Sequence, residues 1–174
     1  MDDLFVSARA VLAASPLRWE SLARGLPADL LARPAAPGQW SALNCLQHVT
    51  DTERFVFPAR VRAFLAGRDF EAFDPDSRGT VAQTGRSAAE LTAEFAALRA
   101  ESLRLFDRLT PADLPRTAVH AELGPVTLSN LLHEWAGHDL MHTVQAERAL
   151  MQPFIDGCGP WLGYFTDHVV HAHG

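Results

Sequence analysis

The sequence has few cysteines, no excess of basic residues and no long hydrophobic run. Cys45 and Cys158 are the only cysteines among 174 residues, too few for a disulfide framework. Acidic residues outnumber basic ones by 21 to 15, so nucleic acid is not an expected partner. Charged residues or histidine interrupt every apolar stretch before about 18 residues, the length that spans a bilayer. The sequence therefore predicts no nucleic-acid partner and no membrane partner.

The length and composition of the chain limit the expected number of domains and the expected cellular compartment. A chain that is 48% hydrophobic and 21% charged fits one compact domain with a full core, which we assign to residues 1–174. The start of the chain, Met1-Asp2-Asp3, lacks the basic and apolar features of an export leader. With so few cysteines, we expect a soluble protein of a reducing cytoplasm.

Helical periodicity dominates the first part of the chain. Apolar residues at steps of three and four predict a helix over residues 3–25, with a break or kink at Ser15-Pro16 that would divide it into two pieces. Ser41 is a suitable N-cap for a second helix that ends near Leu65, and Pro58 predicts a bend within it. Residues 68–86 are rich in Asp, Gly, Ser and Thr and predict a long loop.

The second part of the chain repeats this helical pattern. A capping box of Ser87 and Glu90 begins a helix to about residue 109, with Arg99 and other charged residues placed largely outside its apolar stripe. Thr127 or Ser129 caps a helix through about residue 151, and residues 153–171 predict a further one. The only strand candidate is 117–120. We predict an all-α protein, an antiparallel four-helix bundle with long loops and an additional C-terminal helix.

Three histidines provide the one pattern that indicates chemistry. His138 and His142 are four residues apart, so on a helix both rings lie on one face within reach of a single ion. His48, on the second predicted helix, is a candidate third ligand. Three imidazoles would leave the fourth position of a divalent ion open to water or substrate. His133 is five residues before His138 and points elsewhere, which excludes the zinc protease signature with histidines four apart.

Several features of this pattern stay open. A histidine pair at this spacing also occurs on ordinary helix faces without a metal. Glu134 is either an exposed helix charge or a further ligand or base, and Cys45 is either a buried apolar residue or a ligand. Asp51 lies close enough to His48 on the helix to line a site. His120 and His133 are interpreted as hydrogen-bonding or surface residues without a functional role.

Four segments of the chain carry motifs that we consider together. They are Pro37-Gly38-Gln39-Trp40-Ser41, the run from His48 through Asp51 and Glu53 to Arg54, Gly124-Pro125-Val126-Thr127-Leu128, and the run from His138 through Asp139 and His142 to Gln145. Together these segments resemble the DinB-like (damage-inducible) family of metal-binding helical bundles. By this resemblance His48, His138 and His142 match the family's three metal ligands. It implies zinc or nickel as the ion and a homodimer as the common assembly.

The resemblance leaves the reaction open. Some members of the family resemble thiol-dependent transferases, so one hypothesis is a metal-dependent thiol S-transferase that takes a low-molecular-weight thiol as cosubstrate. In that reaction the ion lowers the pKa of a bound thiol or water and presents it as a nucleophile to a small-molecule substrate. The alternative is a non-catalytic stress-response protein that binds a metal or small ligand. No catalytic residue beyond the candidate ligands is indicated.

Overall fold

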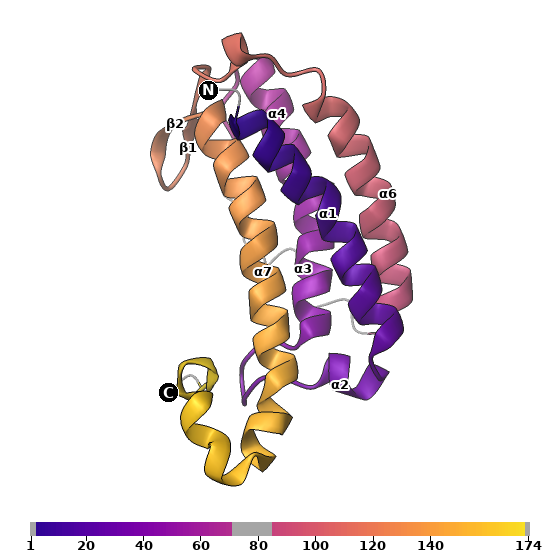
Figure 1. Ribbon diagram of the computed structural model, residues 1–174. Helices are drawn as coiled ribbons and strands as arrows, with labels where there is room; N and C mark the ends of the chain where they lie inside the picture. The colour runs from indigo at the N-terminus through magenta and orange to yellow at the C-terminus, as the bar shows by residue number, and fades with distance from the viewer. Residues whose placement is uncertain (1–2, 71–84, 173–174) are drawn as a thin grey trace.

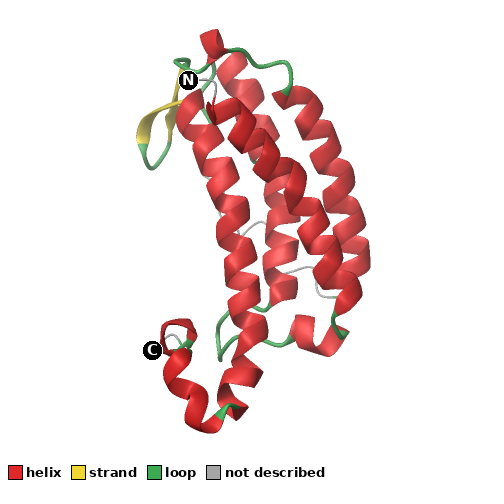
Figure 2. Cartoon of the chain, in the orientation of Figure 1, coloured by secondary structure: helices red, strands yellow, loops and turns green. Residues whose placement is uncertain are grey.

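The computed structural model describes residues 3–70 and 85–172. The elements are the helices α1 (Asp3–Gly25), α2 (Ala28–Ala32), α3 (Ala42–Phe55), α4 (Phe57–Leu65), α6 (Ala88–Phe106) and α7 (Leu128–Gly157), the strands β1 (Thr117–His120) and β2 (Gly124–Thr127), and 3₁₀ turns at Pro111–Asp113, Gly159–Tyr164 and Thr166–His168. Figures 1 and 2 show α1, α3 with α4, α6 and α7 side by side, which confirms the predicted four-helix bundle. In the described ranges, no helix combines the length and the apolar character needed to cross a membrane.

Helix α3 runs antiparallel to α7 and brings the predicted site residues together. The ring of His48 lies 4.5 Å from that of His142, and the ring of Phe57, at the start of α4, stacks on Trp135 at 5.3 Å. A residue later in the α3–α4 unit therefore contacts a residue earlier in α7, as antiparallel helices require. Helices α1 and α6 are antiparallel too, since Arg9 pairs with Asp107.

The other two neighbouring pairs run parallel, which the sequence did not predict. Glu53 on α3 bonds Arg99 on α6, and Phe64 on α4 packs in one cluster with Phe106. Along α1 and α7, Trp19 likewise clusters with Leu150 at the far end of the bundle. Parallel neighbours are possible because a long connection, between α4 and α6, separates consecutive helices. Most of the predicted loop 68–86 lies outside the described residues.

The hydrophobic core has two clusters, one toward each end of the bundle. The first contains Leu12, Phe57, Phe64, Phe106 and Trp135, and the second contains Trp19, Leu46, Leu91, Phe95 and Leu150. Each cluster takes residues from all four helical units, so burial of these side chains fixes how the helices pack. Polar and charged side chains lie at the level between the clusters, where α3 faces α7.

Helix α1 continues through Pro16, so the predicted break at Ser15-Pro16 is wrong. Proline has no N–H, and the carbonyl of Leu12, four residues earlier, loses its helical donor. The guanidinium of Arg99 donates to that carbonyl at 2.9 Å instead. The side chain of Ser15 also bonds the carbonyl of Val11 at 3.0 Å. A tertiary contact thus replaces the missing helical bond.

The predicted bend near Pro58 is present and divides the helix into α3 and α4. Val56 joins them with φ −111° and ψ −76°, and Pro58 occupies the first turn of α4, where a missing N–H has little cost. The N-cap Ser41 is confirmed, with a reciprocal bond to Asn44. This cap and bend hold α3 between two fixed ends, with His48 in its middle.

The start of α7 is set by a capping box and a β-hairpin. Thr127 accepts from the backbone of Asn130, whose side chain bonds back to Thr127. Strand β1 matches the predicted candidate at 117–120, and its antiparallel partner β2 was not predicted. The hairpin packs beside α4 and places His120 close to the bundle.

The C-terminal end differs from its prediction in type and bounds. Helix α7 continues through Pro153 to Gly157, beyond the predicted end near residue 151. The additional C-terminal helix consists of two 3₁₀ turns rather than an α-helix over 153–171. Gly159, with φ 55°, is the first residue of these turns, two residues after the end of α7. The turns fold back along the lower end of α7 (Figure 1), where Gln152 bonds the backbone of Val170 and His168.

Candidate metal centre

The three histidines predicted from the sequence meet between α3 and α7. A ring nitrogen from each of His48, His138 and His142 lies within 4.8 Å of the others. The Nε2 atoms of His48 and His138 are 3.1 Å apart, and the rings of His138 and His142 are 4.4 Å apart. In the described part of the chain, no other group of His, Cys, Asp or Glu has this arrangement.

Burial keeps these imidazoles neutral. Burial, together with a smaller effect of the nearby His142, lowers the pKa of His48 to about 4. For His138, burial and the two neighbouring histidines lower the pKa to about 2. Burial also lowers the pKa of His142, although Gln145 and Asp139 oppose this shift. A neutral imidazole has a lone pair available, which is the form that binds a metal ion.

Aromatic and amide side chains fix the orientation of the rings. Trp40, just before α3, stacks on His142 at 5.9 Å with an angle of 23°, and Phe57 meets His138 edge-on at 5.0 Å. The Nδ1 atom of His142 lies 2.9 Å from Oε1 of Gln145. Because that oxygen only accepts, Nδ1 of His142 carries the proton and Nε2 keeps its lone pair.

The donor set fits a divalent metal ion. Two nitrogens bound to one zinc ion in tetrahedral geometry lie about 3.3 Å apart, close to the 3.1 Å between His48 and His138. The same spacing suits a hydrogen bond between the two rings. The buried Nδ1 of His138 has no hydrogen-bond partner among the described residues, so this ring makes its polar contact through Nε2. Three neutral imidazoles suit zinc, nickel, copper or iron.

Residues that the sequence left open lie outside the histidine cluster. Cys45 is fully buried in the apolar cluster with Trp19, and burial raises its pKa to about 12, which keeps it a neutral thiol. Asp51 accepts two hydrogen bonds from Gln47, at 3.0 and 2.9 Å. Glu134 is an exposed helix charge, 3.7 Å from Arg60.

A buried charge network beside the histidines was missed by the sequence analysis. Arg99 is only 1% exposed and donates to Asp139 at 2.6 and 3.1 Å and to Glu53 at 2.7 Å. Trp135 donates to the same Glu53 oxygen at 3.1 Å. Burial alone would lower the pKa of Arg99, but the two carboxylates outweigh it and raise the pKa.

The predicted position of Arg99 outside the apolar stripe is therefore wrong. Its spacing of four from the core residue Phe95 was the signal that could have placed it on the buried face. Glu53 lies on the same helix as His48, and Asp139 directly follows His138, so Arg99 ties the helix that carries His48 to the helix that carries His138. We infer that this network holds α3 and α7 in register.

Two cavities flank the histidine cluster. One, of about 240 Å³, is lined by His48, His138, Arg60, His120 and Glu134, among others. The other, of about 410 Å³, lies toward the C-terminal turns.

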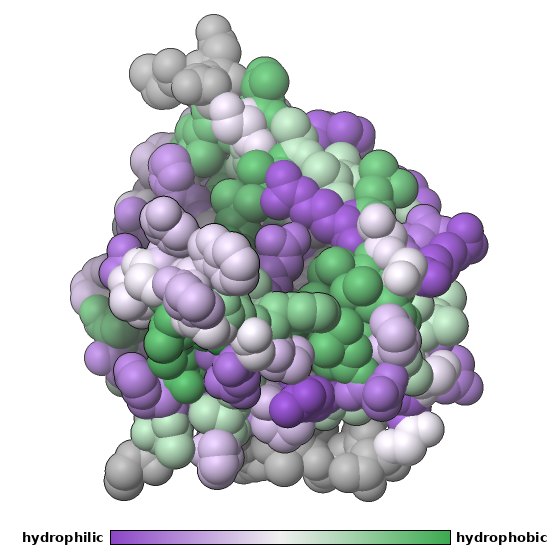
Figure 3. All heavy atoms as spheres, turned by 60° about the horizontal axis from the view of Figure 1, so that its bottom comes forward, coloured by the Kyte–Doolittle hydropathy of each residue, from purple (hydrophilic) through white to green (hydrophobic). Residues whose placement is uncertain are grey.

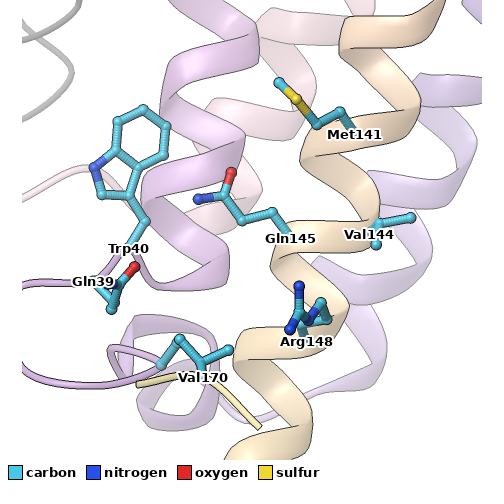
Figure 4. A pocket seen from close by; sticks show the side chains of 8 residues that line it. Gln39, Trp40, Met141, Val144, Gln145, Arg148 and Val170 are labelled. Carbon is cyan, nitrogen blue, oxygen red and sulfur yellow. The ribbon is translucent and has the colours of Figure 1, made fainter. Parts of the chain in front are cut away.

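Figure 4 shows this second cavity, with Gln39 and Trp40 on one side, α7 on another and Val170 at the C-terminal segment. Gln145 and Trp40 line this cavity, and both also contact His142. Figure 3 views the molecule from the lower end of Figure 1, where apolar and polar side chains are interspersed.

Fold and site together define a helical bundle with a three-histidine centre between two helices, a class of candidate metal proteins. A family model described as the DinB superfamily matches residues 12–146, and the chain belongs to this superfamily. The resemblance predicted from its motifs is confirmed.

A solved structure with a similar fold is described as YfiT from Bacillus subtilis, a probable metal-dependent hydrolase with an unusual four-helix bundle topology. The TM-score is 0.76 at 17% sequence identity, over 86% of this chain and 87% of that one. At this identity the likeness shows the fold. No curated protein sequence matches the chain significantly.

Proposed function

We propose that this protein binds one divalent ion, zinc or nickel, through His48, His138 and His142 and activates a small nucleophile beside it. The observation that carries the proposal is the convergence of three neutral imidazoles from two helices on one point, with His48 and His142 buried and His138 half-buried. The bundle holds α3 and α7 at a fixed distance through the Arg99 network, so the three nitrogens are brought together before a ligand binds.

The donor set supports an open coordination position. Three protein ligands are typical of catalytic zinc, whereas structural zinc sites more often have four, and neither Cys45 nor Glu134 belongs to the cluster. A divalent ion held there would lower the pKa of water or of a thiol.

The chain supplies polar groups next to the histidines. Glu134 precedes His138 by one helical turn and lines the same cavity, so its carboxylate is a candidate proton acceptor for a nucleophile in that cavity. Arg60, on the facing helix, lines the cavity too. The cavity thus offers a candidate acid–base group and a cation close to the candidate centre.

Two reactions are compatible with this arrangement. Water as the nucleophile gives hydrolysis, and the similar fold of YfiT, described as a probable metal-dependent hydrolase, supports this version. A low-molecular-weight thiol as the nucleophile gives S-transfer to an electrophile, the reaction favoured by the family resemblance. A non-catalytic role, in which the ion only links α3 and α7, is the competing proposal.

Metal content tests the first step. Elemental analysis of the purified protein should give about one equivalent of a divalent ion per chain, and His48→Ala or His142→Ala should abolish it. The matched control is His133→Ala, an exposed histidine on the same helix, which should keep the full equivalent. Equal metal content in all the variants would overturn the proposal.

Activity and metal removal test the second step. The zinc- and nickel-loaded protein should hydrolyse small activated esters or conjugate bacterial thiols to chloro-nitroaromatics, and the reaction that is lost in His48→Ala identifies the nucleophile. A chelator should abolish that rate and leave the helical circular dichroism signal in place. If chelation unfolds the protein and neither reaction is accelerated, the ion has the linking role.

A further inference from the structure

The 240 Å³ cavity beside His48 and His138 is lined by a second polar feature. Arg60 extends from α4 and His120 ends strand β1, and their side chains meet there. Arg60 is 8% exposed and His120 is 7% exposed, so water reaches neither freely. Both are therefore groups whose hydrogen bonds the protein or a ligand has to supply.

Arg60 has weak partners for a buried guanidinium. Its Nη1 lies 3.7 Å from Glu134, whose side chain is 52% exposed, and this ion pair contributes little. The face of the guanidinium lies over Phe70 at 5.1 Å. By contrast, Arg99 donates to two buried carboxylates at 2.6–3.1 Å. Arg99 therefore has close hydrogen-bond acceptors for its guanidinium, whereas Arg60 has too few.

The contact between Arg60 and His120 lacks an acceptor. The backbone N–H groups of Glu122 and Leu123 donate to Nδ1 of His120, at 3.2 and 3.4 Å. A neutral imidazole has one acceptor nitrogen, so its proton is on Nε2. That N–H faces Nη2 of Arg60 at 3.2 Å, and a guanidinium only donates. Two buried donors thus point at each other.

We propose that Arg60 and His120 form a subsite for the carboxylate of a small substrate whose reacting part lies at the three histidines. A carboxylate oxygen accepts from both facing N–H groups and resolves the donor conflict, while its second oxygen is available to the guanidinium fork. That the bound carboxylate belongs to a substrate rests on the proposed function, whereas binding of a carboxylate at Arg60 and His120 does not.

The charges around the cavity favour a carboxylate over phosphate. Glu122 and Glu134 line the same cavity as Arg60. A second negative charge on the ligand would be repelled by these carboxylates, so a monoanion fits better than a phosphate dianion. The planar carboxylate also matches the guanidinium fork.

Binding of butyrate, with butyramide and inorganic phosphate as comparison probes, tests the subsite. The protein is treated with a chelator so that butyrate has no metal ion to bind, its fold is checked by circular dichroism, and dissociation constants are measured by NMR titration. Butyrate should bind more tightly than butyramide and phosphate. Arg60→Met should weaken butyrate binding about tenfold or more. Arg62→Met, an exposed arginine on the same helix, should leave it unchanged.

The outcomes separate this inference from the metal proposal. Equal binding of butyrate and butyramide by the wild-type protein overturns the subsite without any variant, and tighter binding of phosphate overturns the carboxylate class. Arg60→Lys keeps the positive charge but loses the planar guanidinium with its two parallel N–H groups. Its affinity for butyrate should lie between those of the wild-type protein and Arg60→Met. If the protein binds a full equivalent of metal but does not prefer butyrate to butyramide, the proposed function holds and the subsite is refuted. If the protein prefers butyrate to butyramide but never binds metal, the subsite holds and the proposed function is refuted.

Discussion

Replacement of Arg99 by methionine removes the positive charge at the centre of a buried network. Through side chains this network joins α6 to α3 and α7, and through a backbone carbonyl it joins α6 to α1. The guanidinium bonds Glu53 on α3, Asp139 on α7 and the carbonyl of Leu12 on α1. The side chains of Glu53 and Asp139 are 0% and 2% exposed. Arg99→Met therefore leaves two carboxylates in the core without a counter-charge.

The expected loss of stability is large compared with the stability of a domain. Removal of one partner from a buried ion pair costs about 3–5 kcal/mol, because the remaining charge stays buried. The free energy of unfolding of a single domain is about 5–15 kcal/mol. Arg99→Met should thus lose about a fifth or more of the total, and the carbonyl of Leu12 loses its replacement donor as well.

Urea unfolding followed by circular dichroism at 222 nm measures the effect. Arg104→Met, an exposed arginine on the same helix, is the matched control and should change the free energy of unfolding by about 0.5 kcal/mol or less. The triple variant Glu53→Gln, Arg99→Met, Asp139→Asn should recover part of the loss because no charge stays buried. If Arg99→Met is as stable as Arg104→Met, the reasoning is refuted. The same holds if the triple variant recovers nothing.

Three further predictions concern the site and its helices. Gln145→Leu removes the partner of Nδ1 of His142 and should weaken zinc binding about 10–100-fold in a competition titration with a chromophoric chelator; an unchanged affinity would contradict the orienting role. The folded-state pKa of His48, about 4, lies below its ordinary value of 6.5, so the unfolded chain binds more protons between these values. The free energy of unfolding of the metal-free protein should therefore fall as pH falls from about 6.5 to about 4, and a flat series of urea midpoints would speak against buried neutral histidines. Thr127→Ala removes the cap of α7 and should cost about 1 kcal/mol, whereas Thr127→Ser keeps the bond to Asn130 and should cost less; equal losses would exclude capping as the cause.

Local chemistry made much of the fold predictable. The caps at Ser41, Ser87 and Thr127 and the bend near Pro58 depend on residues within one helical turn, and all are present. Pro16 shows the limit of such reasoning. Its helix continues because Arg99, distant in sequence, bonds the carbonyl that proline leaves without a donor.

The candidate site was predictable to a similar degree. The spacing of His138 and His142 places both rings on one face of α7, since the helical period alone decides this. His48 was a candidate third ligand from its place on another predicted helix, and the family resemblance supported it. The packing of α3 against α7 brings the three rings together. The carboxylate partners of Arg99 and the meeting of Arg60 with His120 have no local signature, because each joins elements far apart in the chain.

The sequence by itself determined the helices, their caps and the pair of histidines four residues apart, because these depend on hydrogen bonds and periodicity within one segment. The homodimer, the cytoplasmic location and the identity of the ion stay predictions. Only the tertiary structure decided which helices run parallel, which charges are buried and what surrounds the histidines. Burial and long-range pairing arise when the helices pack, and the neutral state of the imidazoles depends on that packing.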